Sequence, residues 1–230
     1  LDRRPDRLAD TQAALAASDA KDVPLFRLPA HDGQKLTVER FMTPVALAEW
    51  RDFQRTRRRV HHSQLSPGAI GCYLSHVDAW RFVAAQPTDD AVPHVVIEDD
   101  VVVPKNFQRR VKELWTAAKF VHSRSAKSKL PFILLLNLTC FEGCSTICKA
   151  GLMQPAHFWG TAAIALSKSA ANALLAMPDL FPLDVQIDAY IRRLTAAGRL
   201  ALYAFPLCGQ RDSGTNIQVA IVDGAPFDRT

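Results

Sequence analysis

Apolar residues recur at helical spacing in several stretches of the chain. The clearest helix follows Ser66-Pro67, an N-cap residue followed by a first-turn proline, and its apolar positions run from Ile70 to Ala84. The same spacing predicts further helices at about 5–17, 45–53, 106–118, from 167 to the break at Pro178, and at about 184–197. The last of these should end at Gly198, the usual place for a C-terminal glycine.

Short apolar, β-branched runs alternate with these helices. They predict strands at about 25–28, 94–103, 132–138, 161–166 and 200–205. Helices and strands that alternate over the whole length indicate a layered α/β fold. We therefore expect one domain over residues 1–230, with a mixed, mostly parallel sheet and helices on both faces.

Composition and charge narrow the function classes. The chain has 230 residues, of which 48% are hydrophobic, so it can bury a sizeable core and is not disordered. Its net charge of +5 is only weak evidence for a nucleic-acid partner, because it is equally compatible with binding of anionic small molecules. The most basic stretch, 55–62, is interpreted as a solvated loop, with phosphate capture and nucleic-acid contact as the alternatives.

The apolar stretches are too short to cross a membrane. The longest, 200–208, contains Pro206 and falls well below the roughly 20 residues that span a bilayer. The chain opens with Leu1-Asp2-Arg3-Arg4-Pro5 and has neither an initiator Met nor an apolar leader, so we expect it to begin inside a larger protein. The compartment is left open between the cytoplasmic side of a membrane and the lumen of the endoplasmic reticulum.

Three of the five cysteines are clustered. Cys140, Cys144 and Cys148 form a C-x3-C-x3-C pattern whose spacing matches no common zinc knuckle. This segment is therefore predicted to carry free thiols or one local disulfide, with a metal site as the less favoured alternative.

Three consecutive carboxylates, Glu98, Asp99 and Asp100, interrupt the strand predicted at 94–103. Burying them without a counter-charge would cost several kcal/mol, so we expect a positive group there. Ligands of open α/β sheets bind at the carboxyl ends of strands, and oxygen ligands suit Mg²⁺ or Mn²⁺. Alternation along a strand puts Glu98 and Asp100 on one side and Asp99 on the other. The alternative is a solvated acidic turn.

The helix after Pro67 carries a polar stripe. Gly71, Ser75 and Asp78 fall at i, i+4 and i+7, so a ligand could approach this face closely. Taken alone, His76 is more typical of a structural histidine than of a catalytic one.

Several segments occur together in the order seen in one family. They are Leu1 to Arg7, Ala30-His31-Asp32-Gly33, Gly71 to Trp80 with its Gly-Cys-x-Leu-Ser-His core, Val96 to Asp100, Gly160-Thr161-Ala162, Pro182-Leu183-Asp184, Ser213 and Asn216-Ile217-Gln218. In combination they resemble glycosyltransferase family 25, which includes bacterial lipooligosaccharide galactosyltransferases and collagen hydroxylysine galactosyltransferases.

The resemblance implies a GT-A-like, Rossmann-type fold, a UDP-sugar donor, Mn²⁺ (or Mg²⁺), and inversion at the anomeric carbon. It further implies transfer, with galactose as the expected sugar, to a hydroxyl of a glycan or of a hydroxylated protein, with no nucleic-acid partner. Asp100 would bind the metal, and Glu98 would contact the ribose or a metal-bound water. The donor-binding residues implied by the family motifs are Arg3, Arg7, Asp32, Ser75, His76, Glu98, Asp99, Gly160 and Thr161. The strand that precedes the opening motif in the family is absent, which predicts an incomplete uracil pocket.

An inverting transfer needs a carboxylate base to take the proton of the acceptor hydroxyl. Asp184 and Asp188 are four residues apart at a predicted helix start and share a face. Asp184 is favoured as the base because it matches the Pro-x-Asp pattern of the family, and Asp188 is the second candidate. The alternative is that Asp184 only caps the helix. A catalytically inactive sugar-nucleotide-binding module and a nucleic-acid binder using residues 55–59 remain as other function classes.

Overall fold

The structure is a computed structural model that describes residues 5–59, 61, 63–142, 144–211, 221–222 and 225–226. The helices are α1 (Pro5–Ala16), α2 (Pro44–Thr56), α3 (Pro67–Ala84), α4 (Phe107–Ser123), α5 (Lys168–Leu175) and α6 (Ile187–Ala196), with the 3₁₀ turns η1 (Gly33–Lys35) and η2 (Val38–Phe41). The strands are β1 (Arg58–Arg59), β2 (His94–Ile97), β3 (Val101–Val102), β4 (Phe132–Leu135), β5 (Thr139–Glu142), β6 (Ser145–Thr146), β7 (Met153–Gln154), β8 (His157–Trp159), β9 (Ala163–Leu166), β10 (Ala201–Ala204), β11 (Gly209–Gln210), β12 (Ile221–Val222) and β13 (Ala225–Pro226).

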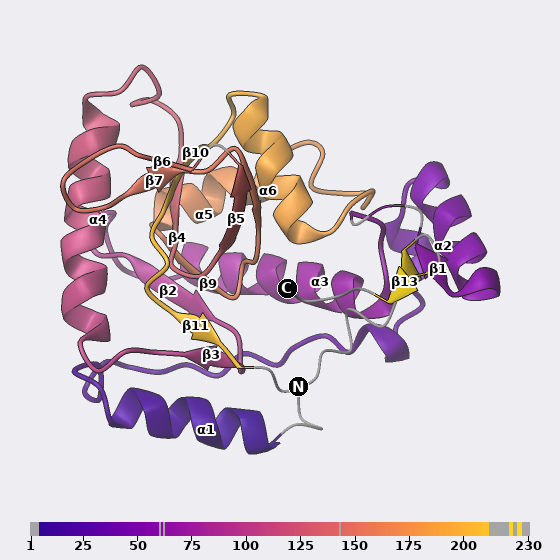
Figure 1. Cartoon of the computed structure of the whole chain (residues 1–230), viewed down its shortest axis with the longest axis horizontal. Helices are drawn as coiled ribbons and strands as arrows, with labels where there is room; N and C mark the ends of the chain where they lie inside the picture. Colours follow the sequence, from indigo (N-terminus) through magenta and orange to yellow (C-terminus); the bar gives the residue numbers. More distant parts are fainter. Residues whose placement is uncertain are drawn as a thin grey trace.

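A central sheet with the strand order β2-β9-β4-β10-β7-β6 organises the molecule (Figure 1). Strands β4 and β10 are parallel, whereas β9 is antiparallel to both of its neighbours, β2 and β4. The pairs β10/β7 and β7/β6 are antiparallel as well. The sheet is therefore mixed but mostly antiparallel.

The prediction of a mostly parallel sheet is wrong, because the chain returns from β4 to β9 without a helical crossover. Helix α4 connects β2 to β4, and these two strands run in the same direction because both are antiparallel to β9. The described residues between β4 and β9 form no helix and hold the short strands β5 to β8. A return without a helical crossover brings β9 back antiparallel, between β2 and β4.

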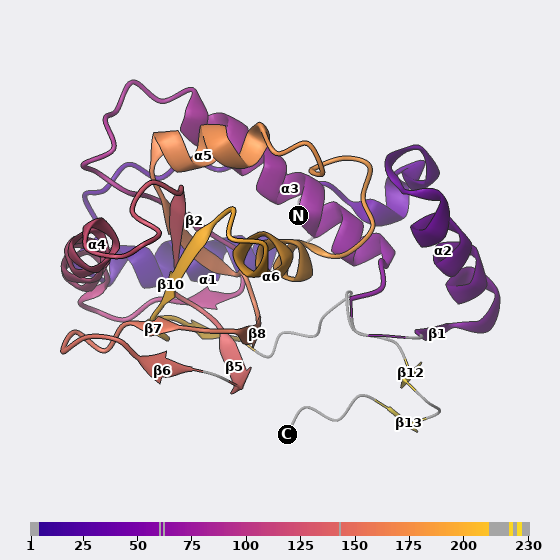
Figure 2. The same ribbon diagram turned by 90° about the horizontal axis from the view of Figure 1, so that it is seen from above.

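Both faces of the sheet are covered by helices, as the sequence predicts. Along β4 the side chains alternate: Ile133 and Leu135 belong to the hydrophobic cluster formed with α2, α3, α5 and α6. Leu134 and Leu136 belong to a second cluster, with α4, β3 and the edge of α1. Figure 2 shows α3 and α5 lying side by side over the first face, and the two helices are in contact.

Capping residues fix the helix boundaries that the sequence indicates. The hydroxyl groups of Ser66 and Ser167 each accept a hydrogen bond at 3.2 Å from the third residue of the helix that follows, α3 and α5. Gly198, just beyond α6, has a φ of +66°, which favours glycine. Helix α6 begins at Ile187, so Asp184 precedes it and is not its N-cap; Gln186 holds that position.

The strand predicted at 25–28 is wrong. This segment has no regular secondary structure, and the side chains of Leu25 and Phe26 are 51% and 60% exposed. Phe26 packs on Phe82 of α3 at a ring-centroid distance of 5.2 Å, so its apolar character serves a helix contact rather than a sheet.

Helix α2 and strand β1 project beyond one end of α3 in both views (Figures 1 and 2). This part of the chain carries the basic stretch, and Arg55 pairs there with Asp52 at 2.6 Å. Among the helices that the structure describes, none has both the length and the apolar character needed to span a bilayer.

Candidate active site

One edge of the central sheet gathers the polar segments that the sequence singles out. The carboxyl ends of β2, β4 and β10 meet there, together with the start of β9. The Glu98 N–H donates to the Ala162 carbonyl at 2.8 Å, and the Asn137 side-chain amide donates to the Cys208 carbonyl at 3.0 Å. The carboxylate segment after β2 therefore lies beside residues 160–162, as expected for a site at strand ends.

Arg7 is the positive group expected beside the carboxylates. Its guanidinium Nη1 lies 3.5 Å from Asp99 Oδ1 and 3.6 Å from Asp100 Oδ2, and its side chain is 16% exposed. Thr11, one helical turn further along α1, donates its hydroxyl hydrogen to the Asp99 carbonyl oxygen at 3.0 Å. The prediction of a counter-charge is confirmed, and α1 supplies it.

Asp100 is buried and only partly satisfied. Its Oδ2 accepts a hydrogen bond from the Gln210 side chain at 3.2 Å, and its backbone oxygen accepts one from Arg211 N at 2.8 Å. Within the part of the chain that the structure describes, its Oδ1 is buried without a hydrogen-bond partner. Burial, followed by the charge of Glu98, raises the pKa of Asp100 above its ordinary value. The surroundings of Asp100 therefore disfavour its charged form, even with Arg7 beside it.

The three acids do not alternate as strand residues would. A turn follows Ile97, with the Val101 N–H donating to the Glu98 carbonyl at 3.3 Å. Asp99 and Asp100 both reach Arg7, while Glu98 turns towards α3. The predicted separation of Asp99 from the other two acids is therefore wrong, because extended geometry ends with β2.

Glu98 meets two side chains of α3 that are one helical turn apart. Its Oε1 lies 3.3 Å from His76 Nε2 and accepts a hydrogen bond from the Cys72 thiol at 3.7 Å. His76 is 4% exposed, and Glu98 has a side-chain exposure of 31%. Burial, followed by the charges of Glu98 and Asp188, raises the pKa of Cys72. Cys72 belongs to the Gly-Cys-x-Leu-Ser-His motif but was not predicted as a site residue, although its i, i+4 spacing to His76 is a signal that could have identified it.

The polar stripe of α3 is occupied by the chain itself. Ser75 Oγ accepts from His31 N at 2.9 Å and donates to the Gly71 carbonyl at 2.7 Å. The His31 ring contacts Asp78 at 2.6 Å. Burial opposes the shift, but the hydrogen bonds to His31 and Arg81 lower the pKa of Asp78. The close approach predicted for a ligand at this face is made by residues 31–33.

Asp32 caps the adjoining turn. Its Oδ1 accepts a hydrogen bond from Gln34 N at 3.2 Å, which fixes the start of η1. The next residue, Gly33, is buried against α3. Asp32 is thus held at the N-terminal end of α3, and part of its hydrogen-bonding capacity is used locally.

The two candidate bases have different surroundings. Asp184 forms an ion pair with Arg193, and both side chains are a little over one third exposed. Asp188, in the first turn of α6, accepts hydrogen bonds from Ala189 N at 2.8 Å and from the backbone N–H of Gly160. Burial raises the pKa of Asp188, opposed by these backbone donors and by Arg192. Of the two acids, Asp188 is the one that lies beside the segment after β8.

Gly160 and Thr161 connect β8 to β9 at this edge. Gly160 has a φ of +102°, and a β-carbon on it would lie 3.3 Å from Asn137 Oδ1, so both conformation and space favour glycine. Thr161 is 5% exposed. The preceding Trp159 lies under the Arg192 guanidinium, 4.1 Å from its ring centroid.

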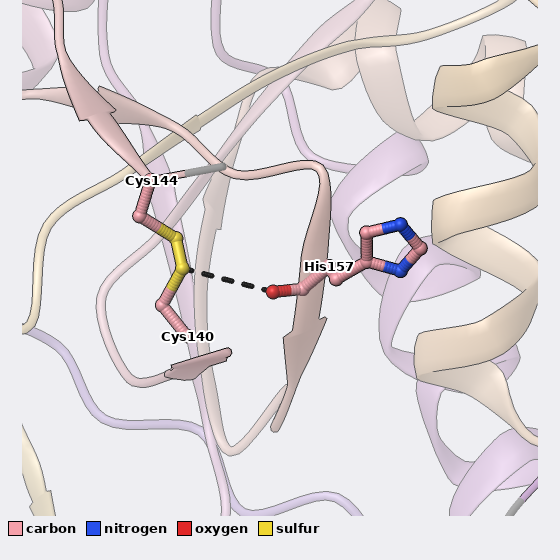
Figure 3. The surroundings of a disulfide bond; sticks show 3 residues. All are labelled: Cys140, Cys144 and His157. Atoms are coloured by element: carbon pink, nitrogen blue, oxygen red, sulfur yellow. Dashed lines mark hydrogen bonds between the residues drawn. A yellow bond between two sulfur atoms is a disulfide. The ribbon is translucent and has the colours of Figure 1, made fainter. Parts of the chain in front are cut away.

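A disulfide between Cys140 and Cys144 closes the turn after β5, and the Cys140 sulfur lies 3.6 Å from the His157 carbonyl oxygen (Figure 3). Cys148 has a free thiol. Of the alternatives left open by the sequence for this cluster, the structure shows one local disulfide together with one free thiol. The predicted positions Arg3, Ser213 and 216–218 lie outside the described residues.

A known family model matches most of the chain. The family model described as glycosyltransferase family 25 (LPS biosynthesis protein) matches residues 1–191. A comparison with curated proteins gives no match. The matched range includes the carboxylates after β2 and both Asp184 and Asp188, and it ends before Gln210. The resemblance indicated by the sequence motifs is confirmed.

Proposed function

The chain belongs to glycosyltransferase family 25 and is a glycosyltransferase with a sugar donor and an acceptor, and we propose that the donor is a UDP-sugar. In this proposal a hexosyl group, galactose in the first instance, passes with inversion to a hydroxyl of a glycan or of a hydroxylated protein. The scaffold is proposed to be a GT-A-like, Rossmann-type fold, and the reaction to depend on Mn²⁺ or Mg²⁺.

The arrangement of Asp99 and Asp100 around Arg7 at the end of β2 is the observation that carries this proposal. It combines carboxylates that suit a cation with a guanidinium that suits a diphosphate. The site lies at the carboxyl ends of three strands that run in the same direction, where open α/β sheets bind nucleotides.

The residues present fit a divalent cation. Asp100 Oδ1 is buried without a hydrogen-bond partner in the described chain, and burial, followed by the charge of Glu98, raises the pKa of this carboxyl. Carboxylate oxygens are the ligands that Mg²⁺ and Mn²⁺ prefer. Asp100, with Glu98, would hold the ion. A bound ion would neutralise negative charge on the departing diphosphate.

The side chains of this protein have distinct proposed roles. Arg7 adds a second positive charge beside the diphosphate and keeps Asp99 and Asp100 oriented. His76 is a positioning residue, because its Nε2 fixes Glu98 Oε1. Asp32, Ser75, Gly160 and Thr161 remain proposed donor-site residues. Asp32 acts from the loop packed on α3, Ser75 from α3 itself, and Gly160 and Thr161 from the loop before β9.

Asp188 is the better-supported candidate for the base. It is buried beside Gly160, and its charge acts on Cys72, which contacts Glu98. A carboxyl group with a raised pKa is better matched to proton abstraction near neutral pH. Asp184 remains the second candidate, and its ion pair with Arg193 competes with that role.

Donor hydrolysis tests the proposal. Incubation with UDP-galactose and Mn²⁺ should release UDP, and EDTA should abolish this release. Asp100→Asn should lose most of the activity, whereas Asp89→Asn, at an exposed position, should retain it. Binding of UDP without hydrolysis or transfer, over a panel of UDP-sugars, would instead indicate a sugar-nucleotide-binding module.

A further inference from the structure

Three side chains of different chemistry converge where α3 meets the end of β2. The Cys72 thiol, the His76 imidazole and the Glu98 carboxylate each place one ligand-type atom within 4.8 Å of the others. Glu98 Oε1 lies 3.7 Å from Cys72 Sγ and 3.3 Å from His76 Nε2. This cluster is distinct from the pair of acids held by Arg7.

The two separations measured from Glu98 Oε1 are those of ligands around one small cation. Donor atoms about 2.0 to 2.3 Å from a tetrahedral Zn²⁺ lie roughly 3.3 to 3.7 Å from one another. Cys72 and His76 are at i, i+4 on one helix face, so the backbone of α3 holds both in place. Cys72 Sγ and His76 Nε2 lie within 4.8 Å of each other, so modest side-chain movement is enough for all three groups to reach one ion.

The ligand types select a different metal from the one proposed for sugar transfer. Thiolate and imidazole favour Zn²⁺ and other borderline-soft cations, whereas Mn²⁺ and Mg²⁺ prefer all-oxygen sites. The cluster provides three protein ligands, the number found in zinc sites that keep a fourth position open. The partly exposed Glu98 side chain provides a path of entry.

We propose that Cys72, His76 and Glu98 form a binding site for Zn²⁺ or a cation of the same class, with one coordination position left open. Because Glu98 is also proposed to serve the donor site, Zn²⁺ at this position withdraws it from that role. The inference does not depend on sugar transfer, since it concerns metal coordination by these three side chains alone.

Cobalt spectroscopy on the metal-free protein tests this site. We expect titration with CoCl₂ to produce a thiolate-to-cobalt charge-transfer band and the visible bands of tetrahedral Co²⁺. Equimolar Zn²⁺ should abolish both, and equimolar Mn²⁺ should not. Cys72→Ser should remove the charge-transfer band, whereas Cys148→Ser, at another free thiol, should retain it. His76→Gln should weaken Co²⁺ binding at least about tenfold. Even the loss of a residue that only hydrogen-bonds to a metal ligand weakens metal binding by about that factor.

X-ray absorption provides a second readout that does not depend on the folding of the Cys72 variant. In the Cys148→Ser protein with one equivalent of Zn²⁺, the first shell should contain one sulfur together with nitrogen or oxygen ligands. A first shell without sulfur, or a charge-transfer band that persists in Cys72→Ser, overturns the proposal. Loss of Mn²⁺-dependent hydrolysis alone leaves the zinc result unchanged, so the two proposals fail separately.

Discussion

Gly33 lies against the first turn of α3 so closely that a β-carbon on it would be 1.7 Å from the carbonyl oxygen of Pro67. The contact is reciprocal along the helix, since a β-carbon on Gly71 would lie 2.5 Å from the His31 carbonyl oxygen. Two glycines thus allow the loop at 31–33 to pack on the helix that carries Cys72 and His76.

Gly33→Ala is expected to destabilise the fold. The added methyl group would push the backbone of the loop at 31–33 away from the backbone of α3. Overpacking of this kind lowers the free energy of unfolding by about 1 to 3 kcal/mol or more. Thermal unfolding followed by circular dichroism should show a melting temperature lowered by several degrees. Gly209→Ala is the matched control, because among the described residues its β-carbon would meet only Val102, at an ordinary 3.6 Å. Equal melting temperatures for the two variants would show that the loop does not pack as described.

Asp188→Asn should reduce sugar transfer by about a hundredfold to ten-thousandfold, the usual range for the loss of a general base. Binding of UDP should persist, because the acids after β2 are unchanged. Asp184→Asn serves as the comparison. Loss of its exposed ion pair with Arg193 should cost at most about 1 kcal/mol of stability and leave transfer largely intact.

Single-turnover transfer rates for the two variants decide between the carboxylates. A collapse of transfer in Asp184→Asn with normal rates in Asp188→Asn would return the base to Asp184. Normal rates in both would place the base elsewhere.

Asp100→Asn should stabilise the cation-free protein near neutral pH. Because burial and Glu98 raise the folded-state pKa of Asp100, the folded state binds more protons than the unfolded state between the two pKa values. Stability therefore falls as the pH rises through that window, and the neutral amide removes this penalty.

Differential scanning calorimetry in EDTA measures the effect. The variant should melt above the original protein at about pH 7, and the difference should shrink as the pH approaches about 3.9, the ordinary Asp value. A lower melting temperature for the variant at about pH 7 would mean that the contacts with Arg7 and Gln210 outweigh the burial penalty.

The sequence predicts the helices better than it predicts the sheet. Ser66, Ser167 and Gly198 mark helix ends by local hydrogen bonding and backbone conformation, which depend on neighbouring residues alone. The direction of β9 depends on how the chain returns from β4, and no local pattern carries that information. The run at 25–28 has strand character but meets no partner strand in the described part of the chain, and Phe26 packs on α3 instead.

The candidate site was predictable where its members are close in sequence. Carboxylates after an apolar run predict a strand-end site, and the need for a counter-charge predicts a cation without naming Arg7. Gln210, which donates to Asp100, follows β10 and carries no local signal of that contact. The choice between Asp184 and Asp188 also depends on tertiary structure, because only the fold shows that Arg193 pairs with the former.

Isothermal titration calorimetry of UDP binding, with Mn²⁺ and with EDTA, tests the central claim most directly. If Asp100 and Glu98 hold a cation against the diphosphate, UDP should bind tightly with Mn²⁺ and weakly with EDTA, and Asp100→Asn should remove the difference. Equal UDP affinity in Mn²⁺ and in EDTA would contradict the account.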